Sequence, residues 1–533
     1  MTATYDAVVI GGGVNSLVAA ACLAKSGQKV LLLERSAAVG GQSRLDEFVP
    51  GFRADPLGQD AGWLPPAVAR ELGLSGVDRI VPDPTVAVPA GAGQWLSLSR
   101  DAGRAAEQIR RFSTKDAAAW PAFTTLIAKL SGFLESLYLL PAPDVDTTSL
   151  GELIPLLGVA RKLRGLGRKD MVELLRTVPM SVQEVLDDRF ENGFLKAAVG
   201  AVGVTNIRQG PRSGGTAFVL LHQQVGAAAG AIRGRGYWQS SPDALARAVA
   251  AIGARHGVTV RTGAEVARIT VKDDRVTGVV LDGGEEITAR TVLSGADPAQ
   301  TLLGMVDPIW LDPEFLLAVR NIKFRGNAAR VLYALDGLPV FPGLDGTPAA
   351  LAGTLSLSSS LDDIERSADD AKYGRVSESP HIEVQLPSVR WSTMAPPGKH
   401  VLVAQATSAP YRLRTGPWTP AMRDALGNRI TAAIARVAPG FPELVRHCEV
   451  LTPVEIEERY GLTEGAPTQG EMTLDQILFM RPVAGASRYA MPIPGLYLCG
   501  AGTHPGSGIA GGPGWLAARQ VIRDGRENRG GKP

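Results

Sequence analysis

The first apolar stretch of the chain has the pattern of a strand followed by a tight turn and a helix. Ala7-Val8-Val9-Ile10 is a short run rich in β-branched residues, which favours a buried strand, and Gly11-Gly12-Gly13 follows at once. Leu17 to Lys25 carries the alanine-rich packing positions of a helix, and a second apolar run, Val30 to Leu33, ends in Glu34. We therefore predict one β-α-β unit between residues 7 and 34.

The spacing within this unit is that of a dinucleotide-binding fingerprint. Gly11 permits the turn, Gly13 lets a pyrophosphate approach the backbone, and the free amides at the helix start favour phosphate charge. Glu34 stands 23 residues after Gly11, where it is expected to accept hydrogen bonds from ribose hydroxyls. Ser16 replaces the third glycine of the fingerprint and is small enough for close packing of helix on strand. The alternative is a β-α-β unit whose glycines serve packing alone.

A second glycine pair, Gly40-Gly41, follows Glu34 and Arg35 and precedes Gln42. A domain that binds only a nicotinamide dinucleotide needs no second loop at this place. FAD is larger and permanently bound, and it needs close approach of the backbone at a second point along its length. The pair therefore favours FAD as the cofactor, and the alternative is an ordinary Gly-Gly turn.

The middle and the end of the chain contain further pieces of such a domain. Apolar residues recur at helical spacing between Ser241 and His256. Three strands are predicted after this helix, at residues 258–260, 266–271 and 276–281. Near the end, Gly495 to Cys499 predicts a strand that leads into a glycine-rich turn, and residues 509–521 have the pattern of a helix.

Composition and charge exclude several classes of protein. The 533 residues carry 55 Lys and Arg against 53 Asp and Glu, and a net charge of +2 argues against a nucleic-acid binder. Apolar residues make up 45 %, which excludes a mainly disordered chain. The three cysteines lie too far apart for a disulfide framework, and the sequence contains no metal-binding motif. With neither a signal segment nor a spanning apolar run, we expect a cytoplasmic protein, soluble or peripherally attached to a membrane.

Four blocks of the sequence resemble the FAD-dependent amine-oxidase/phytoene-desaturase superfamily. Within it, the similarity is greatest to the carotenoid-desaturase-like branch, which contains the pyridine-nucleotide-disulfide-oxidoreductase-domain-2 proteins and the desaturase-type carotene ketolases. The first block is Gly11 to Gly41 with Gly51 to Asp55 after it, and the most specific is the tail, Leu496 to Gly506. The other two blocks are Gly210 to Pro298, and Pro387-Ser388 with Ala395 to His400.

The resemblance implies an α/β fold with two domains. A Rossmann-like FAD-binding domain is discontinuous, built from residues 1–65, 235–305 and 481–533, and an α+β substrate-binding domain comprises residues 66–234 and 306–480. The tail turn is expected along the ribityl and pyrimidine end of the flavin, although Ala501 stands where many flavoproteins have Asp. The expected cofactor-binding residues are Gly11, Gly13, Ser16, Glu34, Arg35, Gly40, Gly41, Gln42, Val266, Gly500, Thr503, Gly508 and Ile509.

The sequence offers fewer candidates for catalysis and substrate binding than for cofactor binding. His222 and His504 lie in blocks expected near the flavin and are candidates for proton handling, and the alternative is that they hold the local structure. Trp238, Trp391 and Trp515 are candidates for the wall of a substrate tunnel, and core packing is the alternative. Trp391 and Trp515 depart from the polar residues common in the branch. A carotenoid substrate is therefore not carried over.

These features favour an FAD-dependent oxidoreductase that dehydrogenates, or desaturates, a largely apolar small molecule by hydride transfer to flavin N5. One alternative is a saturase or cis/trans isomerase of the same fold that uses reduced flavin. Another is a non-catalytic lipid-binding escort protein, a class that tends to lose the flavin. The electron acceptor is expected to be oxygen, a quinone or a carrier protein, because the sequence contains no separate nicotinamide domain.

A basic, leucine-bearing segment lies in the first part of the predicted substrate domain. Between Leu153 and Arg176, leucines alternate with Arg161, Lys162, Arg164 and other cations. Such a segment can lie on an anionic membrane surface, from which a lipid-soluble substrate would enter. The alternative is a surface helix that packs on the protein through its leucines.

Overall fold

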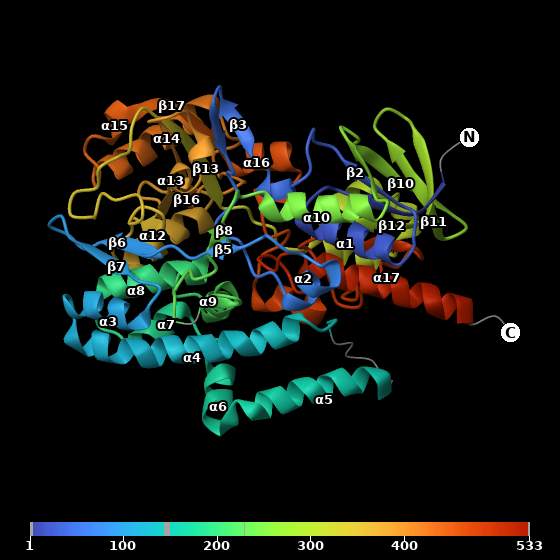
Figure 1. The fold of residues 1–533 in the computed structure, drawn as a ribbon, viewed down its shortest axis with the longest axis horizontal. Coiled ribbons are helices and arrows are strands. Elements are labelled where there is room, and N and C mark those ends of the chain that lie inside the picture. Colours follow the sequence, from blue (N-terminus) through green and yellow to red (C-terminus); the bar gives the residue numbers. More distant parts are fainter. Residues whose placement is uncertain (1–3, 143–149, 229, 531–533) are drawn as a thin grey trace.

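The computed structural model describes residues 4–142, 150–228 and 230–530. It has two lobes, each built around a seven-stranded sheet (Figure 1). The α/β fold class predicted from the sequence is confirmed.

The first sheet draws its strands from both ends and the middle of the chain. At its centre, β1 (Thr4–Ile10) pairs in parallel with β2 (Val30–Glu34) on one side and β12 (Glu286–Ser294) on the other. The strand order is β10-β11-β12-β1-β2-β9, and β18 pairs in parallel with the end of β12. The remaining strands are β9 (Thr259–Thr262), β10 (Val266–Lys272), β11 (Arg275–Leu281) and β18 (Leu496–Leu498).

Both faces of this sheet are buried, which explains the continuous apolar runs in β1 and β2. Because successive side chains of a strand point to opposite faces, Ala7 and Val9 pack with the helices on one side, whereas Val8 and Ile10 pack against the other. The covering helices on the first side are α1 (Val14–Lys25), α10 (Ala244–Arg255) and α17 (Gly512–Gly530), joined by α2 (Pro66–Leu72). On the second side lies α11 (Pro313–Arg320).

The last helix returns to the first. A Cβ built on Gly514 would lie 1.8 Å from the Asn15 carbonyl oxygen, so only glycine allows α17 to approach α1 this closely. The Asn15 side chain accepts a hydrogen bond of 3.0 Å from the Gly511 amide. These contacts hold the tail of the chain beside the opening glycine-rich turn.

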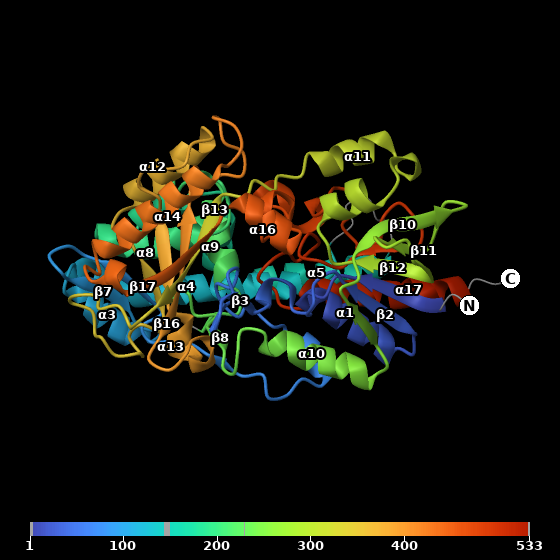
Figure 2. The same cartoon turned by 90° about the horizontal axis from the view of Figure 1, so that it is seen from above.

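The second sheet forms the core of the other lobe. Its order is β17-β13-β16-β15-β14-β6-β7. The strands are β6 (Val86–Pro89), β7 (Trp95–Leu98), β13 (Ala328–Leu335), β14 (Thr354–Ser356), β15 (Ile382–Gln385), β16 (His400–Thr407) and β17 (Val445–Leu451). One face packs against α14 (Pro420–Ala435) through Ile430 and Ile434. Figure 2 shows α14 and α12 (Leu361–Lys372) together on the outside of this lobe.

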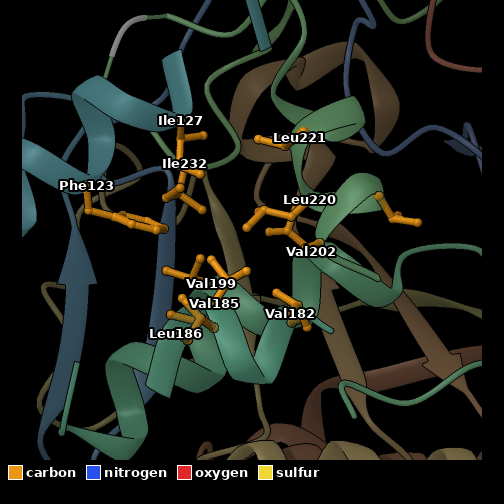
Figure 3. Close-up of a cluster of buried hydrophobic side chains, with 14 of the residues drawn as sticks. Phe123, Ile127, Val182, Val185, Leu186, Val199, Val202, Leu220, Leu221 and Ile232 are labelled. Atoms are coloured by element: carbon orange, nitrogen blue, oxygen red, sulfur yellow. The ribbon is translucent and has the colours of Figure 1, made fainter. Parts of the chain in front are cut away.

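A layer of helices lies beneath the second sheet and forms the largest apolar core. Its helices are α3 (Ala102–Arg110), α4 (Thr114–Tyr138), α7 (Val182–Asp187), α8 (Gly193–Gly200) and α9 (Thr216–Gln224). Figure 3 shows Phe123 and Ile127 of α4 directed toward Val185, Leu186 and Leu220. Short connecting elements complete the fold: β3 (Asp46–Val49), β4 (Phe52–Ala54), β5 (Arg79–Ile80), β8 (Tyr237–Trp238), α13 (Pro387–Arg390), α15 (Phe441–Leu444) and α16 (Pro453–Tyr460).

Two helices, α5 (Leu150–Gly165) and α6 (Gly167–Thr177), form an arm below this layer (Figure 1). The arm packs on the layer through Leu163, Leu166 and Leu174, as the alternative interpretation of the basic segment expected. The basic segment predicted from the sequence falls on this arm, and the glycines at 165 and 167 divide it into two helices. An ion pair of 2.9 Å between Lys129 and Asp170 connects α6 to α4. In the described ranges, no helix combines the length and apolarity that crossing a membrane requires.

Candidate functional site

One large cavity runs from the first sheet to the second lobe. Its lining includes the turn after β1, the glycine pair at 40–41, the tail turn and side chains of the second sheet. Backbone contacts bring these segments together. The Gly295 amide donates to the Ile10 carbonyl at 2.8 Å, and the Cys499 amide donates to the Ser294 carbonyl at 2.8 Å. A Cβ on Gly500 would lie 2.5 Å from the Gly295 carbonyl oxygen.

The turn between β1 and α1 has the geometry of a phosphate cradle. Gly11 has a φ of +91°, which side-chain-bearing residues rarely adopt. Gly13 is the N-cap of α1, no side chain caps the helix, and its first turn contains no acidic residue. The first amides of α1 are therefore free to bind an anion, and the positive end of the helix favours one.

Space for such an anion is present at Gly13. A Cβ built on Gly13 would meet no atom within 4 Å, although Gly13 lines the cavity. A Cβ on Gly41, by contrast, would lie 2.9 Å from the Gly13 Cα, so the second glycine pair packs directly against the first turn. The Gly40 amide donates to the Gly12 carbonyl at 2.8 Å and fixes this contact.

Ser16 fills the place of the missing third glycine without separating helix and strand. A Cβ on Gly295 would lie 1.9 Å from the Ser16 Oγ, and one on Gly11 would lie 3.6 Å from it. The hydroxyl is therefore packed between the ends of β1 and β12. Close packing of α1 on the sheet survives the substitution, as the sequence predicted.

Glu34 lies at the end of β2 with a side chain only 7 % exposed. One carboxylate oxygen accepts from the Gly12 amide at 2.5 Å, and the other accepts from the Ser36 amide at 2.7 Å. The carboxylate thus stabilises the glycine turn and still lines the cavity, where its remaining lone pairs are available to ribose hydroxyls. Arg35 and Val266 line the same end, and the Arg35 guanidinium lies over Gly461.

The other predicted cofactor residues lie along the cavity, with one exception. Gln42, Gly500, Gly508 and Ile509 all line it. Thr503 does not: its buried hydroxyl donates to the Gly500 carbonyl at 2.9 Å and stabilises the tail turn from behind. Its contribution is therefore to the shape of the turn and not to direct contact.

Two buried arginines, which the sequence analysis missed, hold the tail turn. Arg481 donates to the Ala501 carbonyl through two nitrogens, at 2.7 and 3.0 Å. Arg235 is 1 % exposed and donates to the Val225 carbonyl and the Gln223 side chain, both at 3.0 Å. Burial lowers the pKa of both guanidinium groups, that of Arg481 to about 10. A lone arginine in a glycine-rich segment gives no signal of burial in the sequence.

Arg235 also contributes positive charge to the cavity. A Cβ on Gly508 would lie 2.7 Å from its Nη1, so the guanidinium lies against the tail turn. In the part of the chain that the structure describes, no carboxylate forms an ion pair with it. Positive charge at this place favours negative charge on a group bound along the tail turn.

The two candidate histidines do not line the cavity. His222 forms 2.8 Å hydrogen bonds with the Tyr138 hydroxyl and the Ser507 carbonyl, and His504 forms one of 3.1 Å with the Leu140 carbonyl. Burial lowers the pKa of His222 to about 3 and that of His504 to about 4, so both rings are neutral at neutral pH. The geometry favours the structural role that the sequence left as the alternative.

Two of the three candidate tryptophans line the cavity and one does not. Trp238 and Trp391 line the cavity, and the Trp391 indole donates to the Trp238 carbonyl at 3.1 Å. Trp515 does not line it, because the residue lies on α17 and its indole donates to Glu71 at 2.6 Å. The prediction that Trp515 walls a substrate tunnel therefore finds no support: its ring packs in the core between α17 and α1.

Asp55, which the sequence analysis did not single out as a site residue, also lines the cavity. Its carboxylate accepts from the Gly58 amide at 2.6 Å. Burial raises the pKa of Asp55 to about 7, although the Gly58 hydrogen bond and the charge of Arg390 lower it. A carboxyl group that titrates near neutral pH thus faces the enclosed space.

Comparison with known proteins identifies the family. The family described as "Flavin containing amine oxidoreductase" matches residues 17–522. The chain is 33 % identical to pyridine nucleotide-disulfide oxidoreductase domain-containing protein 2 of Rattus norvegicus, over 98 % of this chain and 94 % of that protein. It is 26 % identical to a limonene dehydrogenase component of Castellaniella defragrans, over 97 % of this chain and 93 % of that protein.

Solved structures agree on the fold. Cyclohexylamine oxidase from Brevibacterium oxydans superposes with a TM-score of 0.56 at 14 % identity, covering 98 % of this chain and 99 % of that one. The cradle at Gly13, the carboxylate of Glu34 and the tail turn fit the FAD that the resemblance implies, and FAD is the cofactor. The resemblance stated from the sequence is confirmed: the chain is an FAD-dependent oxidoreductase and belongs to the flavin containing amine oxidoreductase family.

Proposed function

We propose that this oxidoreductase dehydrogenates a largely apolar small molecule. The observation that carries the proposal is the continuity of one cavity, whose lining contains the dinucleotide cradle together with Trp391 and Val403 of the second lobe. Bound FAD supplies a hydride acceptor at its N5 atom. A substrate in the second part of the cavity would lie next to that acceptor.

The residues of this chain have separate tasks in such a reaction. Gly13 and the first amides of α1 bind the pyrophosphate, and Glu34 binds the ribose and holds the turn. Arg235 provides positive charge beside the tail turn, where electron transfer to the ring adds negative charge. Trp238 and Trp391 enclose the substrate and exclude water from it.

Named relatives support dehydrogenation as the direction of the reaction. The limonene dehydrogenase component and the phytoene desaturase of Fusarium fujikuroi, the latter 24 % identical over 97 % of this chain, carry names that denote removal of hydrogen. No residue of the described site favours a saturase or isomerase over a dehydrogenase. We propose oxygen, a quinone or a carrier protein as the electron acceptor.

We also propose that the arm formed by α5 and α6 contacts a membrane peripherally. Leu157 and Leu175 are 68 % and 62 % exposed, and Arg161, Arg164 and Arg168 are exposed on the same pair of helices. Exposed leucines among cations suit a surface of anionic lipid. A lipid-soluble substrate would then be available near the protein.

Anaerobic titration of the holoenzyme tests the proposed reaction. Candidate substrates are added under nitrogen, and the visible absorbance of the flavin is followed while the product is identified by mass spectrometry. The proposal predicts loss of flavin absorbance together with a product that is two hydrogen atoms lighter than the substrate. Conversion that requires prior reduction with dithionite, with no net change in substrate mass, would replace it with an isomerase.

A further inference from the structure

Where the cavity meets the second sheet, its wall is polar. Gln59, Asn206 and Gln385 line it, and they are joined to one another: the Asn206 side chain donates to the Gln59 side chain at 3.2 Å, and Gln385 donates to the Gln59 carbonyl at 2.9 Å. The Asn206 Oδ1 is buried and has no partner in the described part of the chain. A cavity shaped only for a hydrocarbon gains nothing from such groups, because leaving buried polar atoms unpaired destabilises the fold.

Arg390, at the end of α13, is the charged member of this wall. Its guanidinium lies over the Tyr237 ring, 3.6 Å from the ring centroid, and 4.9 Å from the centroid of Trp391. The two rings are perpendicular and hold the planar group in one orientation. Nη1 donates to the Ala352 carbonyl at 2.7 Å, which fixes the other end of the side chain.

Among the described residues, the guanidinium of Arg390 forms no ion pair with a carboxylate. Besides Ala352, the guanidinium contacts the neutral Gln385 at 3.5 Å and the Tyr237 side chain, and its Nε–H has no partner among the described residues. The charge of Asp55 attracts that of Arg390, yet the two side chains form no ion pair in the described part of the chain. Instead, Asp55 accepts from the Gly58 amide, and burial favours its neutral form.

We propose that the substrate carries a carboxylate and that Arg390 binds it. This inference rests on the proposed function, because it concerns the substrate of the same cavity. A buried, oriented guanidinium matches the planar geometry of a carboxylate and forms charge-assisted hydrogen bonds with it. The neighbouring amides of Gln59 and Gln385 bind the remaining polar parts of the head group, while Trp391 and Val403 contact the apolar part. The substrate is therefore an amphipathic acid and not a bare hydrocarbon.

Calorimetric titration of the holoenzyme with octanoate and with octanol tests this inference. The two probes share an apolar chain and differ in the charged head group. We expect octanoate to bind about ten- to a hundredfold more tightly than octanol, as charge-assisted hydrogen bonds to a buried guanidinium imply. Arg390→Gln should abolish the difference between the probes, and Arg390→Lys should keep part of it. The matched control is Arg255→Gln, which removes an exposed charge at the end of α10 and should keep the whole difference.

Three results would overturn the inference: equal binding of octanol and octanoate, tighter binding of octylamine than of octanoate, or an unchanged preference in Arg390→Gln. FAD content and melting temperature show whether a variant is folded, and Arg390→Lys provides a second variant if Arg390→Gln is not. Calorimetry reads binding whether or not turnover occurs. The proposed function and this inference can fail separately. If octanoate binds through Arg390 but no tested acid reduces the flavin, only the proposed function is refuted. If hydrocarbons reduce the flavin and the protein shows no preference for octanoate over octanol, only this inference is refuted.

Discussion

Gly13→Ala separates the role of the first glycine turn in FAD binding from a role in packing. The backbone at Gly13 has φ −68° and ψ 164°, which alanine adopts without strain, and the added methyl group would touch no protein atom within 4 Å. The FAD-free protein should therefore keep its stability or gain about 0.4–1 kcal/mol from the restricted unfolded chain. In the holoenzyme the same methyl group would lie where we propose that the pyrophosphate approaches the backbone.

The cost to FAD binding follows from overpacking. A methyl group forced into a filled contact destabilises by about 1–3 kcal/mol, which corresponds to a loss of affinity of about fivefold to 150-fold. The assay is reconstitution of the FAD-free protein, in which the dissociation constant is read from flavin fluorescence and the melting temperature is measured separately. The control is Gly132→Ala on an exposed face of α4, where a Cβ also meets nothing within 4 Å.

Gly132→Ala should leave FAD affinity unchanged. If Gly13→Ala also keeps its affinity, the pyrophosphate does not lie at this turn. If Gly13→Ala destabilises the FAD-free protein, the glycine serves packing, which is the alternative stated from the sequence.

Four further predictions concern other residues of the protein. Glu34→Gln should lower FAD retention about tenfold, measured after desalting, because the Gly12 or the Ser36 amide loses its acceptor and ribose hydroxyls lose an acceptor oxygen; full retention would contradict the ribose role. Arg235→Gln should lower the flavin midpoint potential by on the order of tens of millivolts, because positive charge at the tail turn is lost; an unchanged potential would remove Arg235 from the mechanism. Folding raises the pKa of Asp55 from 3.8 to about 7, so the folded state binds this proton more tightly than the unfolded state does. The melting temperature of the unaltered protein should therefore fall, relative to that of Asp55→Asn, as the pH rises from about 4 to about 7, and parallel pH profiles of the two proteins would contradict this. Replacing the exposed Leu157 and Leu175 with Ser removes apolar surface and should reduce co-sedimentation with anionic vesicles about tenfold. An absence of binding by the unaltered protein would contradict the membrane proposal.

The sequence predicts the parts of the fold that depend on short-range patterns. The first β-α-β unit, the helix that includes Val249 and the strand before the tail turn all lie where their sequence patterns indicate, because local apolar runs and helical spacing mark the buried positions of each. The strand β12 was missed because polar side chains interrupt its apolar run, although its first half alternates buried with exposed residues, as at Ala289 and Arg290, which is a pattern that predicts a strand. The tail helix α17 begins at Gly512, three residues later than Ile509.

Side-chain direction within the site does not follow from the sequence. His222, His504 and Trp515 all occur in segments close to the flavin site, yet each side chain is directed toward another element, and only the tertiary packing decides this. Arg235 and Arg390 carry no motif at all. Among the described residues neither guanidinium forms an ion pair with a carboxylate, and their surroundings depend on contacts between segments more than a hundred residues apart, as between Arg390 and Tyr237.

The absorption spectrum of the purified protein tests the central claim most directly, namely that both ends and the middle of the chain jointly hold FAD in one cavity. We predict a flavin spectrum, with FAD released on denaturation in a stoichiometric amount. A folded, colourless protein that takes up no FAD when the cofactor is added would contradict this claim.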